Sequence, residues 1–327
     1  MFRWLARGTL ALIALALAGA MWHRAATEAD RRRYPPPGRL VDIGGRRLHI
    51  QTQGEGSPTV VISAAGAAAP LDWTNVLPAV AEFANVCVYD RAGSGWSDPD
   101  GGPRTSRHIG KELRRLLETA GIPGPYVLVG HSIGGIHMRT YTGMFPDDVV
   151  GLVLVDSSHE EQVERLPAAN PTSLEGQIRI LKIVSAIAPF GGVRLLGALG
   201  LAAQILNFEF LQPELRENAR AILYWSNLGD LASELGAIPE TMKQAREAAR
   251  PLGDMPLAVL TAGSADNPAF QREGVREVWL ELQDELAALS TNSKHVVAEK
   301  STHYIHEDEP EIVIDAIRWV VEEVRRS

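Results

Sequence analysis

Five consecutive residues near the middle of the chain, Gly130-His131-Ser132-Ile133-Gly134, form a Gly-x-Ser-x-Gly pattern. The apolar residues 126–129 precede the pattern, and a stretch with helical periodicity follows it to residue 144. A serine on a sharp strand-to-helix turn exposes its hydroxyl, and glycine is wanted two residues before and after because larger side chains would collide there. We therefore predict that Ser132 is a nucleophile.

The backbone N–H of Ile133 would lie at the start of the helix that follows Ser132. The helix dipole and the free donor at that end both stabilise a negatively charged oxygen. A serine hydroxyl is a poor nucleophile until a base removes its proton, so Ser132 also requires a basic partner. These requirements describe acyl transfer through a covalent serine intermediate, with the Ile133 N–H in an oxyanion hole.

The segments around this turn alternate between strand and helix patterns. Strands are predicted over residues 39–43, 46–52, 59–63, 85–90, 126–130, 149–156, 257–262 and 294–299, and helices over residues 72–84, 104–120, 132–144, 273–289 and 309–325. Unbroken apolar runs suit strands that are buried on both faces of a parallel sheet. Gly44-Gly45 is a hairpin signal between the first two strands. The alternation predicts an α/β fold with a mostly parallel central sheet flanked by helices.

The alternation stops between residues 157 and 250, where only helical stretches broken by prolines occur. We predict a core of residues 39–156 and 251–327, with residues 157–250 as a helical lid. The lid contains the aromatic residues Phe190, Phe208, Phe210, Tyr224 and Trp225. Most of them are expected to form the lid's own core, but its composition as a whole suggests a small apolar substrate.

The N-terminal segment differs from the rest of the chain. Arg3 and Arg7 precede the uncharged residues 8–22, which are rich in Ala and Leu. Residues 1–23 are therefore predicted to be a signal peptide, cleaved near Ala20, or a membrane anchor, so that the protein is exported or membrane-anchored. Residues 24–38 are charged and then proline-rich, and are predicted to be a stiff, extended linker. Arginines on both sides of the apolar segment leave its orientation open.

Composition excludes several other classes of protein. The chain has 32 Lys and Arg against 40 Asp and Glu, and no long basic segment, so nucleic acid is not an expected partner. The only cysteine, Cys87, lies in the apolar run 86–89 and is expected to be a small buried hydrophobe. No metal-ligand spacing, phosphate-binding loop or dinucleotide glycine fingerprint occurs, so we predict no metal and no cofactor.

Three further motifs resemble the α/β-hydrolase superfamily, and the resemblance covers about residues 39–325. Residues 40–49 are similar to its opening hairpin, residues 90–98 to its strand-end loop of aspartate, arginine and glycines before a serine, and residues 301–306 to its catalytic-histidine loop. With the serine turn, these motifs are specific for the superfamily but not for a substrate. The resemblance implies a serine hydrolase with a helical lid.

The resemblance also implies the order serine, acid, histidine along the chain. His303 follows the last predicted strand and is the implied general base, with His306 as a rival that is expected near the site or at the surface. Asp266 follows the strand 257–262 by a short loop, which resembles the usual family position of the acid. Asp156, at the end of the preceding strand, is the alternative.

Several other polar residues near these motifs are expected to be structural. His131 should pack or form a hydrogen bond within its loop, and His137 should lie inside the helix after Ser132. Asp90 and Arg91 are interpreted as a structural ion pair.

The second oxyanion donor is less well defined. Many members of the superfamily carry a His-Gly pair after the third strand, where this chain has Ser63-Ala64-Ala65-Gly66-Ala67. Aligning residues 64–65 with that pair makes Gly66 the second donor, whereas a shift by one residue makes it Ala67. A backbone N–H needs no particular side chain, so either alignment preserves the hole.

The leading functional prediction is hydrolysis of a carboxylic ester, or a related acyl bond, through an acyl-enzyme on Ser132. An amidase or acyltransferase would use the same residues. Haloalkane dehalogenases and epoxide hydrolases share the fold but have aspartate in place of Ser132. A ligand-binding or receptor protein on the same fold is the alternative from a different class.

Overall fold

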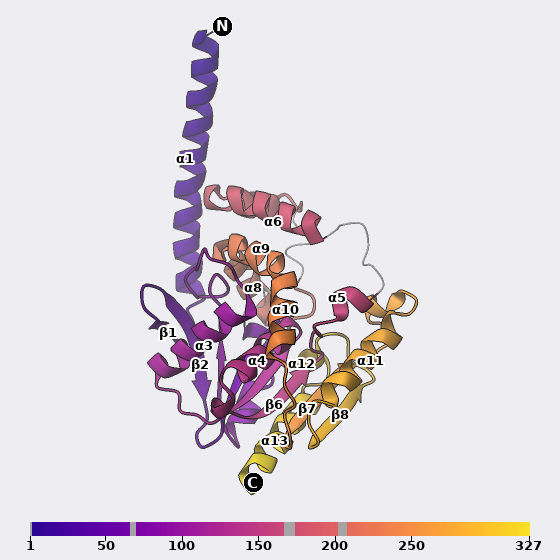
Figure 1. Ribbon diagram of the computed structural model, residues 1–327. Coiled ribbons are helices and arrows are strands. Elements are labelled where there is room, and N and C mark those ends of the chain that lie inside the picture. Colours follow the sequence, from indigo (N-terminus) through magenta and orange to yellow (C-terminus); the bar gives the residue numbers. More distant parts are fainter. Residues whose placement is uncertain (1, 66–69, 167–173, 202–207) are drawn as a thin grey trace.

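The computed structural model describes residues 2–65, 70–166, 174–201 and 208–327 (Figure 1). Its eight strands form one sheet in the order β1-β2-β4-β3-β5-β6-β7-β8. The pairs β1–β2 and β2–β4 are antiparallel and the remaining pairs are parallel. The strands are β1 (Arg39–Asp42), β2 (Arg47–Gln53), β3 (Thr59–Ser63), β4 (Asn85–Tyr89), β5 (Tyr126–His131), β6 (Val149–Val155), β7 (Leu257–Ala262) and β8 (Ser293–Ala298). Each matches a strand predicted from the sequence, and the mostly parallel α/β sheet is confirmed.

The apolar strands separate two hydrophobic cores. In β3, Val60 and Ile62 contribute to one core and Val61 to the other, because successive side chains point to opposite faces of a sheet. All five β3 residues are buried. Helices therefore cover both faces of the sheet, as the unbroken apolar runs predicted.

The helices of the two faces are distributed as follows. Packed on the first core are α2 (Leu77–Ala81), α12 (Ile305–Asp308) and α13 (Pro310–Arg326), and on the second α3 (Ser106–Ala120), α4 (Ile133–Met144) and α11 (Val275–Ala287). Short 3-10 turns are η1 (Pro70–Trp73), η2 (Pro146–Asp148) and η4 (Pro268–Gln271). The helix predicted over residues 72–84 is wrong in extent. Pro78 sits at the start of α2, where its missing N–H is tolerated, so the regular helix begins just before it.

The hairpin between β1 and β2 forms at the predicted glycines. Gly44 and Gly45 have φ angles of 99° and 96°, and both N–H groups donate hydrogen bonds to Asp42 Oδ1. Residues with side chains rarely adopt such angles, so the glycine pair determines the turn.

A helical insertion follows β6 and precedes β7, where the lid was predicted. It comprises α5 (Gln162–Arg165), α6 (Leu174–Ile187), η3 (Ala188–Phe190), α7 (Gly192–Ala198), α8 (Pro213–Trp225), α9 (Leu228–Gly236) and α10 (Ile238–Ala248), and no strand occurs among its described residues. It packs on segments that follow the carboxyl ends of strands: Trp225 Nε1 donates to Gly95 O, and Phe210 stacks on Tyr304.

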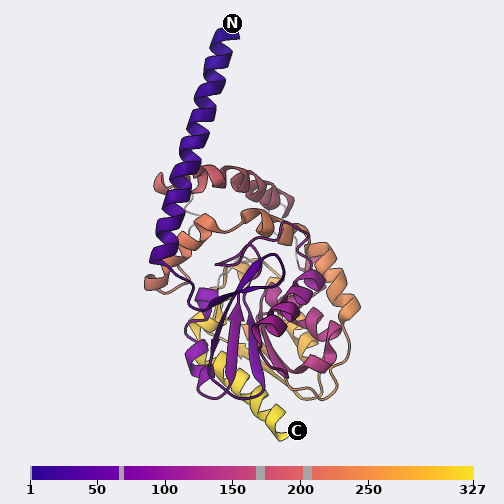
Figure 2. The same ribbon diagram turned by 90° about the vertical axis from the view of Figure 1, so that its left-hand side faces the viewer.

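The N-terminal segment is one long helix, α1 (Phe2–Arg33), which projects from the rest of the molecule (Figures 1 and 2). The prediction of an extended linker over residues 24–38 is therefore wrong for residues 24–33, which continue the helix. This stretch holds the helix former Ala26, and Glu28 pairs with Arg32 one turn later. By length and composition α1 is able to cross a membrane, a property that an N-terminal signal sequence shares.

Candidate active site

Ser132 lies between β5 and α4 with φ 56° and ψ −127°, a strained backbone conformation for a residue with a side chain. Two contacts hold it there: its N–H donates to Val155 O, and its carbonyl accepts from Ser158 N. A Cβ atom on Gly130 would lie 2.5 Å from Gly135 Cα, and one on Gly134 would lie 2.5 Å from Ser63 O. The structure thus places Ser132 on the sharp turn that the glycine spacing predicted.

His303 lies in the loop after β8, and its Nδ1 is 2.6 Å from Oδ2 of Asp156. Asp156 follows β6 and is 2% exposed. Its second carboxylate oxygen accepts hydrogen bonds from Ala262 N at 3.0 Å and from Trp279 Nε1 at 2.9 Å. A carboxylate held in this way fixes the orientation of the imidazole and stabilises its protonated form.

The prediction that Asp266 is the partner of His303 is wrong. Asp266 is exposed beyond β7, and its N–H donates to Ser264 Oγ. Asp156, the alternative, occupies the position instead. Its φ angle of 40° is one of only two positive values among the described non-glycine residues, the other being that of Ser132. The turn after β6 therefore departs from the strand direction at the residue whose carboxylate meets the imidazole.

Ser132 and His303 are brought to the same end of the sheet through His131. The Nε2 atom of His131 lies 2.8 Å from the carbonyl oxygen of His303, so the residue before the serine contacts the histidine loop directly. Among the described residues the Ser132 hydroxyl makes no hydrogen bond to His303. Such bonds often tighten only when substrate binds. The His303 side chain is 35% exposed, which leaves its ring accessible from outside the core.

Of the two predicted oxyanion donors, Ile133 is the first residue of α4, where the N–H has no acceptor within the helix. Gly66 and the alternative Ala67 lie outside the described residues. The residues just before them are held by Arg91, which donates to Ala64 O at 2.8 Å and to Ala65 O at 2.7 Å.

Arg91 also joins this loop to the helical insertion, because it forms a buried ion pair of 3.0 Å with Glu234 of α9. Burial alone would raise the pKa of Glu234, but the Arg91 guanidinium and His137 hold the pKa below its ordinary value. The expected ion pair between Asp90 and Arg91 is wrong. Asp90 accepts from Trp96 N and lies 3.0 Å from His49 Nδ1, since adjacent residues at a strand end point in opposite directions.

A buried polar cluster lies behind His303. His306 Nε2 is 3.3 Å from Asp72 Oδ2, and the His306 ring stacks on Trp73 with centroids 4.5 Å apart. The ring of His131 is 4.5 Å from that of His306. Burial, with added repulsion from His306 and His303, holds the pKa of His131 well below its ordinary value, so this ring is neutral. His131 thus forms a hydrogen bond to the histidine loop rather than within its own loop, and His306 lies near the site.

Within the described parts of the chain, two groups of side chains have the composition and spacing to hold a metal ion, because their ligand-type atoms lie within 4.8 Å of one another. They are Asp72 with His131 and His306, and Asp100 with His108 and Glu112. Arg46 and Arg104 contact both acidic residues of the second group, so its negative charge is already compensated. Sequence spacing did not reveal the first group, because its three members come from η1, β5 and α12. In the second group His108 and Glu112 lie one turn apart in α3, and only Asp100 comes from outside that helix.

Aromatic residues of the insertion reach the histidine loop. Phe210 stacks on Tyr304 with centroids 4.3 Å apart, and Tyr304 lies 5.6 Å from the His303 ring. Phe208 is 6.3 Å from Phe210. Apolar aromatic surface therefore borders the candidate base.

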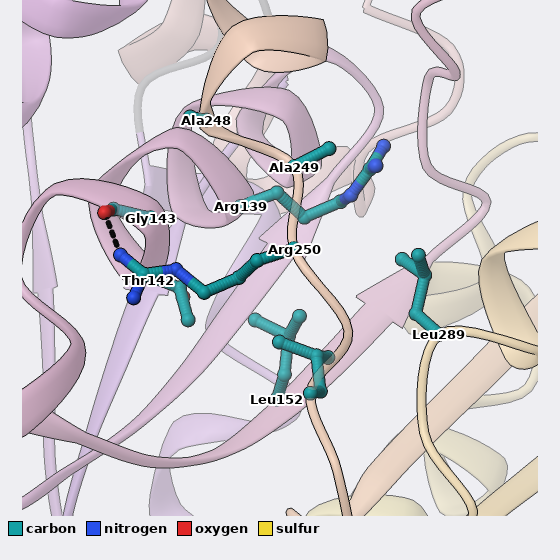
Figure 3. A pocket seen from close by; sticks show the side chains of 9 residues that line it. Arg139, Thr142, Gly143, Leu152, Ala248, Ala249, Arg250 and Leu289 are labelled. Carbon is teal, nitrogen blue, oxygen red and sulfur yellow. Dashed lines mark hydrogen bonds between the residues drawn. The ribbon is translucent and has the colours of Figure 1, made fainter.

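A separate small cavity lies beside the C-terminal half of α4, where the chain returns from the insertion to the core (Figure 3). Arg250 donates a hydrogen bond to Gly143 O at its edge. The cavity has a volume of about 20 Å³ and accommodates about one water molecule, whereas sites for small organic ligands are more than tenfold larger. This cavity is not a substrate site.

The chain is similar to several known proteins. Over 322 residues the chain is 29% identical to "Probable transporter efuK" of Hormonema carpetanum, an alignment that covers 88% of this chain but 43% of that protein. It is 25% identical to the uncharacterized protein YqjL of Bacillus subtilis (strain 168), covering 84% of this chain and 88% of that protein.

Among solved structures, an esterase from Thermogutta terrifontis superposes with a TM-score of 0.63 and 21% identity, covering 85% of this chain and 94% of that one. This likeness shows the fold. Residues 59–316 match the model of the "Alpha/beta hydrolase family", which spans the serine turn, the helical insertion and the histidine loop. The chain belongs to the alpha/beta hydrolase family.

Proposed function

We propose that the protein hydrolyses a carboxylic ester, or a related acyl bond, through an acyl-enzyme on Ser132. The observation that carries this proposal is the 2.6 Å hydrogen bond between His303 and Asp156, in a loop that contacts His131, the residue before a serine on a strained strand-to-helix turn. A buried carboxylate that orients an exposed imidazole beside a serine is the arrangement that activates an alcohol for attack.

In the proposed reaction, His303 Nε2 takes the proton of the Ser132 hydroxyl while Nδ1–H stays bonded to Asp156. The serine oxygen forms a bond to the acyl carbon, and the carbonyl oxygen becomes an oxyanion that the Ile133 N–H stabilises. The imidazolium returns its proton to the departing alcohol as the ester bond breaks. Water then attacks the acyl-serine with His303 as base, which releases the carboxylic acid and regenerates Ser132.

The substrate side of the proposal rests on the aromatic residues that border His303. Phe208, Phe210 and Tyr304 supply apolar surface and few polar groups, which favours a small apolar acyl or alkyl group over a charged one. An amidase or an acyltransferase would use the same residues and differ in the leaving group or in the nucleophile that reaches the acyl-enzyme.

Labelling with a fluorophosphonate probe tests the mechanism. We expect one label per chain on the wild type, none on Ser132→Ala, and normal labelling on Ser185→Ala, a control in α6 away from the turn. Chromogenic esters of increasing acyl length would then rank the substrates. A folded wild type that neither reacts with the probe nor cleaves any ester would contradict the proposal and favour a ligand-binding protein on this fold.

We further propose that α1 is a retained membrane anchor. Its N-terminal part presents apolar side chains to the surroundings, including Leu12 and Leu15, which are 68% and 69% exposed. Its C-terminal part packs on the insertion, where Asp30 forms a 2.6 Å ion pair with Arg194. Mass spectrometry of the purified protein tests retention, because cleavage at Ala20 would remove the whole apolar stretch before Met21.

A further inference from the structure

The exposed apolar side chains of the insertion gather on one part of it, residues 174–201, which comprise α6, η3, α7 and the turn after α7. Seven of the ten large apolar side chains that are exposed in the described residues outside α1 lie here. They are Ile180, Ile183, Ile187, Phe190, Leu195, Leu199 and Leu201. A soluble protein rarely exposes so concentrated an apolar surface without a partner. We call these seven residues the apolar ridge.

The segment that carries the apolar ridge contacts α1 at one level along its axis, residues 19–30. Gly19 packs closely on Phe190, because a Cβ added to Gly19 would lie 2.5 Å from the carbonyl oxygen of Phe190. The ring of Trp22 covers Gly191. One to two turns further along α1, Thr27 and Asp30 bind Arg194. The ridge therefore meets α1 where its uncharged residues 8–22 end and its charged residues begin.

This height coincides with a membrane surface if α1 is an anchor. A bilayer that contains the uncharged part of α1 would end near Trp22, a residue type that favours the boundary between lipid and water. Figures 1 and 2 show α6 running across α1 at this level rather than parallel to it. An amphipathic helix that lies in the plane of the interface has this orientation.

Charge supports the same partner. Arg179 and Lys182 are exposed on α6 and alternate with Ile180 and Ile183 of the ridge. Basic side chains beside apolar ones suit anionic lipid headgroups above acyl chains, because their alkyl parts lie along apolar surface while the charge stays in water. The chain as a whole carries a net charge of −8, so this local positive charge departs from the average.

We propose that the apolar ridge docks in the interface of the same lipid bilayer that α1 enters, as a second contact between protein and membrane. The occupant is the lipid surface, and the proposal rests on the anchoring of α1 but not on the hydrolase chemistry. The insertion that borders His303 is then seated on the membrane.

Fluorophores on single cysteines test the docking in the full chain, reconstituted into nanodiscs of phosphatidylcholine and phosphatidylglycerol. Burial raises the pKa of the native Cys87 to about 12, so its thiol stays unreactive. Probes are placed at Ile183→Cys and Leu195→Cys on the ridge, at Leu12→Cys in α1, and at Val163→Cys in α5, an exposed apolar control outside the ridge. Quenching by lipids with spin labels at shallow or deep positions reports the depth of each probe.

We expect shallow quenching at positions 183 and 195, deep quenching at 12 and none at 163. Ridge probes that behave like position 163, while position 12 is quenched, overturn the docking and leave the anchor intact. Absence of quenching at position 12 overturns both the docking of the apolar ridge and the anchoring of α1. Shielding of 183 and 195 that persists in detergent together with a dimer mass assigns the ridge to a second copy instead.

A second measurement tests the charge argument. Raising the phosphatidylglycerol fraction should shift the emission of the position 183 probe further to the blue, and the double substitution R179E/K182E should abolish this dependence. Unchanged dependence in the double variant contradicts the role of the two basic residues. Neither measurement uses activity, so their outcome is independent of whether Ser132 forms an acyl-enzyme.

Discussion

His303 Nδ1 and Asp156 Oδ2 lie 2.6 Å apart, although 147 positions separate the two residues in the chain. Asp156 is held by two further donors from β7 and α11. These donors orient the Asp156 carboxylate toward the imidazole, whereas Asp266 on the neighbouring loop is exposed. This relationship identifies the acid whose removal should matter.

The substitution Asp156→Asn should lower kcat/KM for a chromogenic ester by about 10³- to 10⁴-fold, because an amide cannot stabilise the imidazolium and favours the wrong tautomer. Asp266→Asn is the matched control and should change kcat/KM by less than about twofold, since Asp266 is exposed. Equal losses in both variants, or a larger loss in Asp266→Asn, would show that the observed pair is not the functional one.

The substitution Gly134→Ala should destabilise the protein by about 1–3 kcal/mol and lower kcat, because the added Cβ would lie 2.5 Å from Ser63 O and 2.7 Å from Ala64 O. Gly236→Ala at the end of α9 is the control, since its nearest neighbour there is 3.9 Å away. The control should be neutral or slightly stabilising. Urea denaturation measures both variants, and a neutral Gly134→Ala would refute the steric account of the turn.

Replacing Arg91 by Met should destabilise the protein by about 3–5 kcal/mol, because Glu234 would remain buried without its nearest counter-charge. The double variant Arg91→Met, Glu234→Met should recover part of that stability but not the activity, since Ala64 and Ala65 would still lack their donor. Arg47→Met breaks an exposed ion pair with Asp98 and should cost at most about 1 kcal/mol. Full recovery of kcat in the double variant would mean that Arg91 does not position the loop after β3.

Glu307 gives a pH dependence of stability with a defined sign. Burial, together with the nearby charges of Asp72 and Asp308, raises the pKa of Glu307 to about 7. The folded state therefore binds a proton that the unfolded state has already lost above its ordinary pKa of about 4.3. The stabilisation is complete below that value and is lost as pH rises through about 7.

Glu307→Gln should accordingly flatten the decline in melting temperature between pH 5 and pH 8. Glu311→Gln, at an exposed position in the first turn of α13, should leave the decline unchanged. An identical pH profile for Glu307→Gln and the wild type would show that this carboxyl is not responsible.

Much of the fold could be predicted from local pattern. Apolar runs such as residues 59–63 identified strands that are buried on both faces, and Gly44-Gly45 identified the hairpin, because both signals depend on neighbouring residues only. The turn at Ser132 could also be predicted from its five-residue pattern, although the atoms that exclude a side chain at Gly134 belong to Ser63 and Ala64, which the fold brings there from another segment. The α/β architecture and the family follow from these elements in sequence order.

The tertiary structure alone decided which distant groups meet. Asp156 and Asp266 both follow neighbouring parallel strands, so chain position could not choose between them; the choice depends on the turn after β6 and on the donors from β7 and α11. The Arg91–Glu234 pair, the Asp72–His306 cluster and the packing of α1 on the insertion were likewise out of reach. Each of these contacts depends on the direction in which side chains point and on how whole helices and strands are placed relative to one another. Periodicity along a single segment does not encode either property.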